Sequence, residues 1–239
     1  AMTTAATCQM SLDLRDEVQK TYDLVVVDEA ARANPLDLFI PMSMGKKIVL
    51  VGDHKQLPHM LEPGVLQNIK SDPKFKDIPE IEKSLFERLF DMFSKEPNAK
   101  AVSLTEQYRM HPDICDFVSE EFYDETLKTS EEVTAEKRSS PKMINNGKAL
   151  TFVHVSITRG GETRGKSKSR QAEIDAICQD VKEILKVDRE ATIGIITFYA
   201  AQAAKLKDNL VLTDDELSRV QVGTVDAFQG KQYDYVLLS

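Results

Sequence analysis

The chain has 239 residues, 41% of them hydrophobic and 29% charged, with a formal net charge of −8 at pH 7. This is the composition of an ordinary globular protein with one large domain or two smaller ones. It excludes a protein that is basic over its whole surface, although an acidic body can carry a local basic segment. There is no signal peptide, no apolar run of about 18 residues and no close pair of cysteines. We therefore expect a cytoplasmic protein with reduced thiols and no membrane partner.

Short apolar runs alternate with amphipathic segments along the chain. The runs predict strands at 24–27, 48–51, 101–104, 150–155, 193–197, 220–225 and 235–238. The spacing of apolar residues predicts helices at 85–93, from 112 onward, at 171–185 and after Thr213. Several strand runs are continuously apolar, which is typical of parallel strands covered on both faces. The pattern predicts an α/β fold, and the polar stretch 95–100 favours two lobes, 1–98 and 99–239.

Two adjacent carboxylates, Asp28 and Glu29, follow the first predicted strand. In α/β sheets, ligands bind beyond the carboxyl ends of the strands. One carboxylate there can hold hydrated Mg²⁺ opposite the phosphates of a nucleotide, and the next can orient or deprotonate water. Acidic residues are also common at helix starts, so the pair by itself leaves a structural role open.

The second predicted strand leads into a polar turn at 52–58, with the sequence GDHKQLP. The neutral amide of Gln56 in this turn could sense a γ-phosphate by hydrogen bonding. His54 has no partner His or Cys at metal-ligand spacing, so we expect a hydrogen-bonded loop histidine rather than a metal ligand.

Tyr108 and Arg109 lie between the run at 101–104 and a helix that begins near Pro112. An arginine at this position is well placed to reach an anion. Tyr108 offers an aromatic face, either to a purine or to the core. A last block, VGTVDAFQG at 222–230, runs from a strand into a polar turn.

The one basic cluster in the sequence is 158–170 (TRGGETRGKSKSR), with five Lys or Arg residues and one Glu. Its glycines and serines predict a mobile loop. Two interpretations stay open at this point, a solvated loop or a contact with the phosphates of a nucleic acid backbone.

Four blocks, in the order VVVDEA, VGDHKQLP, LTEQYRMHP and VGTVDAFQGKQYDYVLLS, resemble motifs of superfamily 1 helicases. The best match is the branch that contains the up-frameshift nonsense-decay helicase and senataxin. SLFERL at 84–89 and GIITFYAAQ at 194–202 extend the resemblance, which covers the chain from Asp23 onward. It implies two RecA-like lobes with mainly parallel sheets flanked by helices. It further implies that ATP is hydrolysed in a cleft between the lobes and drives movement on single-stranded DNA or RNA.

The resemblance also implies a role for each residue of the nucleotide site. Asp28 would hold Mg²⁺, Glu29 would be the general base for water, and Gln56 would contact the γ-phosphate. Arg109 would act as an arginine finger that stabilises the transition state, and Tyr108 would stack on the adenine.

A second group of residues falls in blocks that line the nucleic-acid track and the cleft of similar proteins. Their hydroxyls and amides bind phosphate and sugar without reading bases. These residues are Thr3, Thr4, Thr197, Gln202, Thr224 and Gln229.

Parts of the family pattern are missing or changed. The P-loop that grips the phosphates is missing from its place in the family order, ahead of VVVDEA, and the final arginine-bearing motif is missing as well. The GxxxxGK[ST] spacing occurs only as GGETRGKS at 160–167, far after that block. We therefore expect a truncated first lobe, a second lobe without its last motif, and negligible ATP hydrolysis by the chain alone. Gln232 replaces the Glu that contacts the ribose in relatives, and Phe198 replaces a proline.

Other function classes compete with the helicase interpretation. A degenerate module that binds nucleic acid or protein without hydrolysis is favoured by Gln232 and the missing P-loop. The intact residues Asp28, Glu29, Gln56 and Arg109 favour retained hydrolysis. A helicase joined to a nuclease or another effector domain is a third class. A metabolic α/β enzyme is disfavoured, because the sequence has no GxGxxG turn and no nucleophile elbow.

Overall fold

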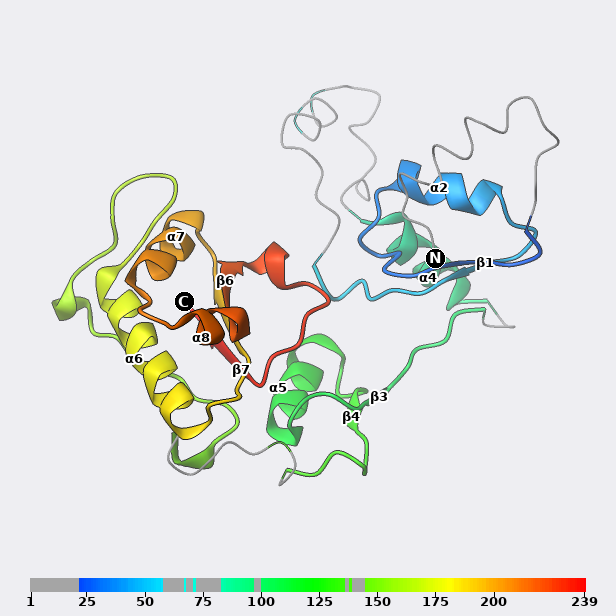
Figure 1. The fold of residues 1–239 in the computed structure, drawn as a ribbon. Coiled ribbons are helices and arrows are strands. Elements are labelled where there is room, and N and C mark those ends of the chain that lie inside the picture. Colours follow the sequence, from blue (N-terminus) through cyan, green and yellow to red (C-terminus); the bar gives the residue numbers. More distant parts are fainter. Residues whose placement is uncertain are drawn as a thin grey trace. The chain divides into compact units, whose positions relative to one another are not determined.

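A computed structural model describes residues 22–57, 67, 71, 83–96, 100–135, 138 and 145–239. The chain divides into two compact units, Ala1–Leu104 and Thr105–Ser239, which Figure 1 shows as ribbons. All strand pairs among the described residues are parallel. The structure therefore has the predicted α/β fold with parallel sheets flanked by helices, as in RecA-like lobes.

Unit 1 contains a two-stranded sheet and two described helices. Strand β1 (Val25–Val27) pairs with β2 (Ile48–Leu50), and the helices are α2 (Pro35–Ser43) and α4 (Leu85–Phe93). The buried core residues of this unit are Ala30, Ala31, Leu38 and Phe86. The small core holds the turns after both strands in place.

Local capping signals explain where both helices of unit 1 begin. The side chain of Ser84 accepts a hydrogen bond from the Glu87 N–H at 3.0 Å, as the sequence predicted for α4. Helix α2 was missed, although its signals were present. Asn34 caps it by accepting from the Asp37 N–H at 3.1 Å, and Pro35 occupies the first turn.

Unit 2 contains a small sheet beside helix α5 and a larger sheet with three helices. The small sheet consists of β3 (Glu106–Gln107) and β4 (Lys128–Thr129), and α5 spans Pro112–Phe122. The larger sheet has the order β6-β5-β7, formed by Val220–Thr224, Ile193–Thr197 and Tyr235–Leu238. Its helices are α6 (Gln171–Val187), α7 (Ala200–Asn209) and α8 (Asp214–Arg219). Among the described residues, the unit also has the short 3₁₀ turns η2 (Asn145–Gly147), η3 (Ile157–Arg159) and η4 (Val225–Phe228).

The core of unit 2 lies between the larger sheet and helices α6 and α7 (Figure 1). Ile193 and Ile195 of β5, Ile174 and Val181 of α6, and Leu206 of α7 are all 0% exposed. Burial of side chains of this size is worth about 1.5–3 kcal/mol each. This core fixes α6 and α7 to one face of the sheet.

Two glycines let a loop pack closely against the opposite face of the larger sheet. A Cβ on Gly194 would lie 2.8 Å from the Tyr233 ring, and one on Gly223 would lie 3.1 Å from Ala227. Phe228 is buried in the same contact. The segment between η4 and β7 is therefore held against the sheet, and Gln232 lies within it.

Two sequence predictions about strands are wrong. Residues 150–155 have no regular secondary structure, and Phe152 is 91% exposed. Residues 101–104 are also irregular, with Leu104 86% exposed, and β3 begins only at Glu106. An apolar run forms a strand only where a neighbouring strand pairs with it, and none does so here among the described residues.

Two further observations concern membranes and thiols. None of the described helices combines the length and apolar character that crossing a membrane requires. Cys115 and Cys178 are buried free thiols, and burial raises the pKa of the Cys178 thiol. Cys8 lies outside the described residues.

We expect Ser84→Ala to destabilise the start of α4 by about 1 kcal/mol, because the Glu87 N–H loses its buried acceptor. Amide hydrogen exchange at Glu87 should become faster. Ser94→Ala is the matched control, since Ser94 is exposed and contributes only its backbone to the helix end. Equal effects of the two substitutions on the exchange of Glu87 would show that the cap is not what stabilises this helix.

Candidate functional site

Asp28 and Glu29 directly follow β1, and both side chains are exposed. The Glu29 N–H donates to Asp28 Oδ1 at 2.9 Å, which leaves the second carboxylate oxygen of Asp28 for a ligand. Glu29 has a φ of 53°, a left-handed conformation that costs a side chain about 1–2 kcal/mol. Residues held in such conformations cluster at ligand sites and active sites.

The turn after β2 lies against the turn that carries these carboxylates. The Ala30 N–H donates to Val51 O at 2.8 Å, and Ala30 and Ala31 are 0% and 4% exposed. A Cβ on Gly52 would lie 2.8 Å from the Ala31 nitrogen, so glycine alone permits this approach. The two polar turns therefore meet at the carboxyl edge of the sheet.

Asp53 shapes the turn that presents Gln56. Its carboxylate accepts from the Lys55 N–H at 3.0 Å and from Gln56 Nε2 at 2.9 Å. Gln56 is exposed, and its amide nitrogen has a second hydrogen that can be donated to a ligand. Held in this way, Gln56 can bind an oxygen atom without adding charge to the site.

His54 faces the core of unit 1. Its ring packs against Phe86 and Phe90, with centroid distances of 6.5 and 5.2 Å. Among the residues that the structure describes, no group of three His, Cys, Asp or Glu side chains could hold a metal ion. A metal bound at this edge through described side chains of these four types would thus have at most two such ligands and keep most of its water.

We expect Gly52→Ala to destabilise unit 1, because the new methyl group would collide with the Ala31 backbone rather than with a movable side chain. Forcing a methyl group into a tightly packed site costs about 1–3 kcal/mol. Gly161→Ala is the control, since a Cβ there would meet nothing within 4 Å. Thermal unfolding followed by circular dichroism measures both, and an unchanged melting temperature for Gly52→Ala would contradict the proposed close contact.

In unit 2, Gln107 builds the turn that carries Tyr108 and Arg109. The side-chain oxygen of Gln107 accepts from the Arg109 N–H at 2.8 Å and from the Met110 N–H at 2.6 Å. Its amide nitrogen donates to Met110 O at 3.0 Å and to Thr129 Oγ1 of β4 at 2.9 Å. Sequence analysis missed this role, and its only signal was the position of Gln107 inside the TEQYRMHP block.

Arg109 contacts Gln232 from the loop that precedes β7. With the amide oxygen turned toward the guanidinium, Gln232 accepts from Nε at 3.0 Å and from Nη2 at 2.8 Å. This orientation satisfies both groups because a guanidinium can only donate. A neutral acceptor orients Arg109 without cancelling its charge, so the cation stays available to an anion. Tyr108 beside it is 54% exposed, and its ring is accessible for stacking.

Two predicted nucleic-acid residues lie opposite one another at the carboxyl ends of β5 and β6. The register pairs Thr197 with Thr224. Thr197 is 0% exposed and donates its hydroxyl to Tyr199 O at 2.9 Å, whereas Thr224 is half-buried. Gln229 follows η4, and its Oε1 is buried with no hydrogen-bond partner among the described residues. A contact of these side chains with nucleic acid stays a prediction.

Gln202 connects three segments of unit 2. It is 4% exposed; its Oε1 accepts from the Arg170 N–H at 2.9 Å, and its Nε2 donates to Ser239 Oγ at 2.8 Å. Both ends of the amide are engaged inside the unit, so Gln202 positions its neighbours in this structure. Thr3 and Thr4, the other two predicted nucleic-acid residues, lie outside the described residues.

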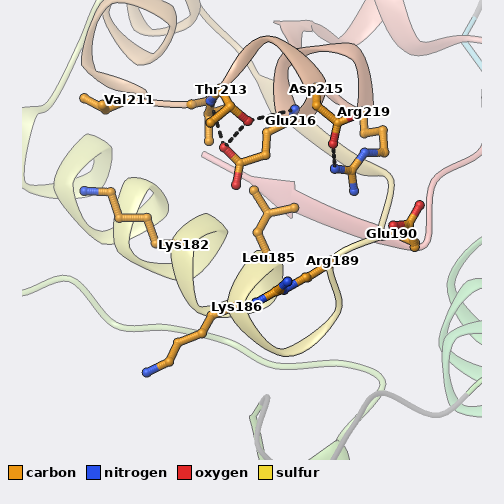
Figure 2. A pocket seen from close by; sticks show the side chains of 11 residues that line it. Lys182, Leu185, Lys186, Arg189, Glu190, Val211, Thr213, Asp215, Glu216 and Arg219 are labelled. Carbon is orange, nitrogen blue, oxygen red and sulfur yellow. Dashed lines mark hydrogen bonds and ion pairs between the residues drawn. The ribbon is translucent and has the colours of Figure 1, made fainter.

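A hollow of about 490 Å³ lies between α6 and α8, away from all of these residues (Figure 2). Two of the three acids that line it, Glu216 and Asp215, already have partners. Glu216 accepts from the backbone and the hydroxyl of Thr213 at 2.8 and 2.9 Å, which lowers the pKa of Glu216. Asp215 pairs with Arg219. The hollow contains none of the residues that sequence analysis assigned to a site.

We expect substitutions of Gln232 to change how firmly Arg109 is held. Gln232→Glu replaces a neutral acceptor by a charged one and should slow the exchange of the Arg109 Nε–H with water, because charge-assisted hydrogen bonds are about twice as strong. Gln232→Leu removes the acceptor and should accelerate that exchange. Nitrogen-15 NMR of the arginine side chain measures it, and identical rates in all three proteins would show that the contact is absent in solution.

The sequence of this chain is similar to those of known proteins over most of its length. Two family models, each described as an AAA domain, match residues 2–61 and 81–239. Over 236 residues the chain is 32% identical to helicase sen1 of Schizosaccharomyces pombe, with 95% of this chain and 13% of that protein covered.

Two further relatives are also named as helicases. The probable helicase senataxin of Homo sapiens is 30% identical over 229 residues, which cover 91% of this chain and 8% of that protein. The ATP-dependent helicase NAM7 of Saccharomyces cerevisiae is 32% identical over 227 residues, which cover 90% of this chain and 21% of that protein. This chain therefore spans only a small part of the length of the relatives it matches.

Proposed function

Because the chain belongs to the superfamily 1 helicases, in their up-frameshift and senataxin branch, we propose that it supplies part of the motor of an ATP-driven translocase. ATP hydrolysis would drive movement along single-stranded DNA or RNA, with residues of both units acting on one nucleotide. Residues 1–98 would be a partial first RecA-like lobe and 99–239 the second. The observation that supports the proposal most is the meeting of the carboxylate turn with the Gln56 turn at one sheet edge.

The donor set at that edge fits Mg²⁺. Asp28 offers an exposed carboxylate oxygen, and Mg²⁺ in nucleotide sites commonly takes one or two carboxylates and several waters. Bound there, Mg²⁺ would neutralise charge on the phosphates. Glu29 follows in a fixed left-handed conformation and would orient and deprotonate the attacking water.

Two further side chains would act on the transferred phosphate. Gln56 would donate its free amide hydrogen to a γ-phosphate oxygen. Arg109 would stabilise the negative charge that grows in the transition state, a contribution worth on the order of 10³–10⁵ in rate. Gln232 holds Arg109 through a neutral contact, so releasing the guanidinium to a phosphate breaks no ion pair. Tyr108, which is exposed, would stack on the adenine.

The nucleic acid would follow the carboxyl edge of the larger sheet, where Thr197 and Thr224 end β5 and β6. The other two predicted residues lie nearby in the chain, Gln202 in the first turn of α7 and Gln229 directly after η4. Hydroxyl and amide groups suit a contact that tolerates any base sequence. A cytoplasmic location stays a prediction from the spacing of the cysteines.

A second candidate function is a binding module that does not hydrolyse ATP. The observation that favours it is the combination of Gln232 with the absence of a P-loop ahead of the VVVDEA block. The test below separates the two functions, because only the motor needs Glu29 for turnover.

We expect Glu29→Gln to reduce nucleic-acid-stimulated ATP hydrolysis by at least about 10²-fold, the scale of general base catalysis, while ATP binding remains. The assay uses the natural protein that carries this chain at its full length. The 239-residue chain alone should hydrolyse ATP negligibly, since no P-loop sequence precedes its VVVDEA block.

Glu125→Gln is the matched control. Glu125 is also exposed and also has a left-handed backbone, with a φ of 59°, but it lies far along the chain from the carboxylate turn. Its substitution should leave turnover unchanged. Full ATP hydrolysis by Glu29→Gln, or no stimulated hydrolysis by the unmodified full-length protein, would contradict the motor and favour the binding module.

A further inference from the structure

The basic segment 158–170, called the basic arm below, has a defined course. The Thr163 N–H donates to Ser169 O at 2.8 Å, and the Ser169 N–H donates to Thr163 Oγ1 at 2.9 Å. The two hydroxyls lie 3.2 Å apart, and Ser169 is 3% exposed. These contacts close the arm into a loop, so the backbone positions of its charged residues are defined.

The arm is attached to the carboxyl edge of the larger sheet. Ser167 Oγ accepts from the Ala201 N–H at 2.9 Å, and the Arg170 N–H donates to Gln202 Oε1 at 2.9 Å. Ala201 and Gln202 form the first turn of α7, which has no cap from its own N-cap residue. Ser167 therefore caps α7 from outside. Figure 1 shows the arm as the yellow-green loop between η3 and α6, near α7.

Two of the five cations of the arm are used to hold it together. Lys168 pairs with Glu162 at 2.7 Å, and this hydrogen bond raises the pKa of Lys168. Arg170 is only 11% exposed and pairs with Glu173 at 2.9 Å. Arg170 also donates to the backbone oxygen of Gly160 in the arm at 2.8 Å and to that of Ser156, just before the arm, at 2.6 Å.

The other three cations, Arg159, Arg164 and Lys166, are exposed. Within the described part of the chain, no carboxylate lies at ion-pair distance from any of them. On a chain with a net charge of −8, such a group of uncompensated cations is a local site of attraction for anions. Two cations of the arm are thus paired with neighbouring acids and hold its shape. The other three are left for a ligand.

Exposed aromatic rings lie beside the arm. Phe198 and Tyr199, which link β5 to α7, are 73% and 41% exposed. The hydrogen bond from the Ala201 N–H to Ser167 Oγ attaches the arm two residues after Tyr199, so the arm approaches the segment that carries both rings. Cations beside exposed rings suit single-stranded nucleic acid, whose phosphates need positive charge and whose unpaired bases stack on aromatic faces. An acidic peptide would use the cations but would leave the rings without a partner.

We propose that the basic arm is a phosphate-binding element for single-stranded nucleic acid, in which Arg159, Arg164 and Lys166 contact the backbone and Phe198 stacks on a base. The inference rests on the proposed function, since it extends the nucleic-acid track at the carboxyl edge of the larger sheet. It assigns to this chain a contact that none of the predicted track residues provides, because those residues carry no charge.

The test measures the binding of a fluorescent oligonucleotide of about 20 thymidines or uridines to the 239-residue chain by anisotropy, at several salt concentrations. The variant Arg159→Gln/Arg164→Gln/Lys166→Gln removes three contacts. Each contact with a single strand contributes about 0.7 to the slope of log affinity against log salt, so the slope should fall by about 2. At about 0.1 M salt this corresponds to a roughly hundredfold loss of affinity.

A matched control removes the same charge elsewhere in unit 2. Lys182, Lys186 and Arg189 line the hollow at the other end of α6 (Figure 2), and Lys182→Gln/Lys186→Gln/Arg189→Gln should leave the salt slope nearly unchanged. Phe198→Ala should weaken binding roughly tenfold without changing the slope, because stacking involves no counterions. All substituted side chains lie at exposed positions. Circular dichroism checks that each variant folds.

Each result bears on the proposal. Equal losses of affinity in the two triple variants would show that only the net charge of the chain matters, and would overturn the proposal. Displacement of the oligonucleotide by a polyglutamate peptide at the same charge concentration would overturn it as well. If the arm variant fails to fold, Phe198→Ala decides, and unchanged affinity overturns the proposal. Unchanged binding in every variant would refute the arm while leaving the proposed function standing. No binding by the unmodified chain at low salt would overturn the proposal, whereas the proposed function is decided by ATP hydrolysis in the full-length protein.

Discussion

Parallel pairing of short strands is the constraint on which both candidate sites depend. It places the carboxyl ends of neighbouring strands at the same edge of a sheet, where α/β proteins bind their ligands. In unit 1 this brings the carboxylates after β1 beside the Gln56 turn. In unit 2 it places Thr197 opposite Thr224. Residues far apart in the chain are therefore brought to the same edge.

Amide side chains, half-buried in Gln107 and buried in Gln202, then connect loops of unit 2. A glutamine can donate and accept at once, so a single side chain can link two or three segments. Gln107 fixes the Arg109 turn to β4, and Gln202 joins the basic arm to the end of β7. Buried polar groups need such partners, and loops built around them are therefore strongly constrained. This explains why the loops that carry the functional side chains have defined courses.

Charged groups that hold the loops in place are also distinct from those that would bind an anion. In the basic arm, Lys168 and Arg170 are neutralised by neighbouring acids, and three other cations are left uncompensated. Arg109 is held by the neutral Gln232 rather than by a carboxylate. In both places the groups that set the geometry are paired, whereas the groups that would meet an anion keep their charge.

The sequence by itself determined the α/β class, the starts of α4 and α8, and the polar residues at the strand ends, because capping spacings and continuous apolar runs are local signals. It failed for 101–104 and 150–155, since an apolar run becomes a strand only when another segment pairs with it. The tertiary structure alone decided that Gln232 would hold Arg109, that Gln202 would be buried, and that the basic arm would be attached to α7. Each of these depends on contacts between residues distant in the chain, and no local pattern of residues encodes which distant partner a side chain will meet.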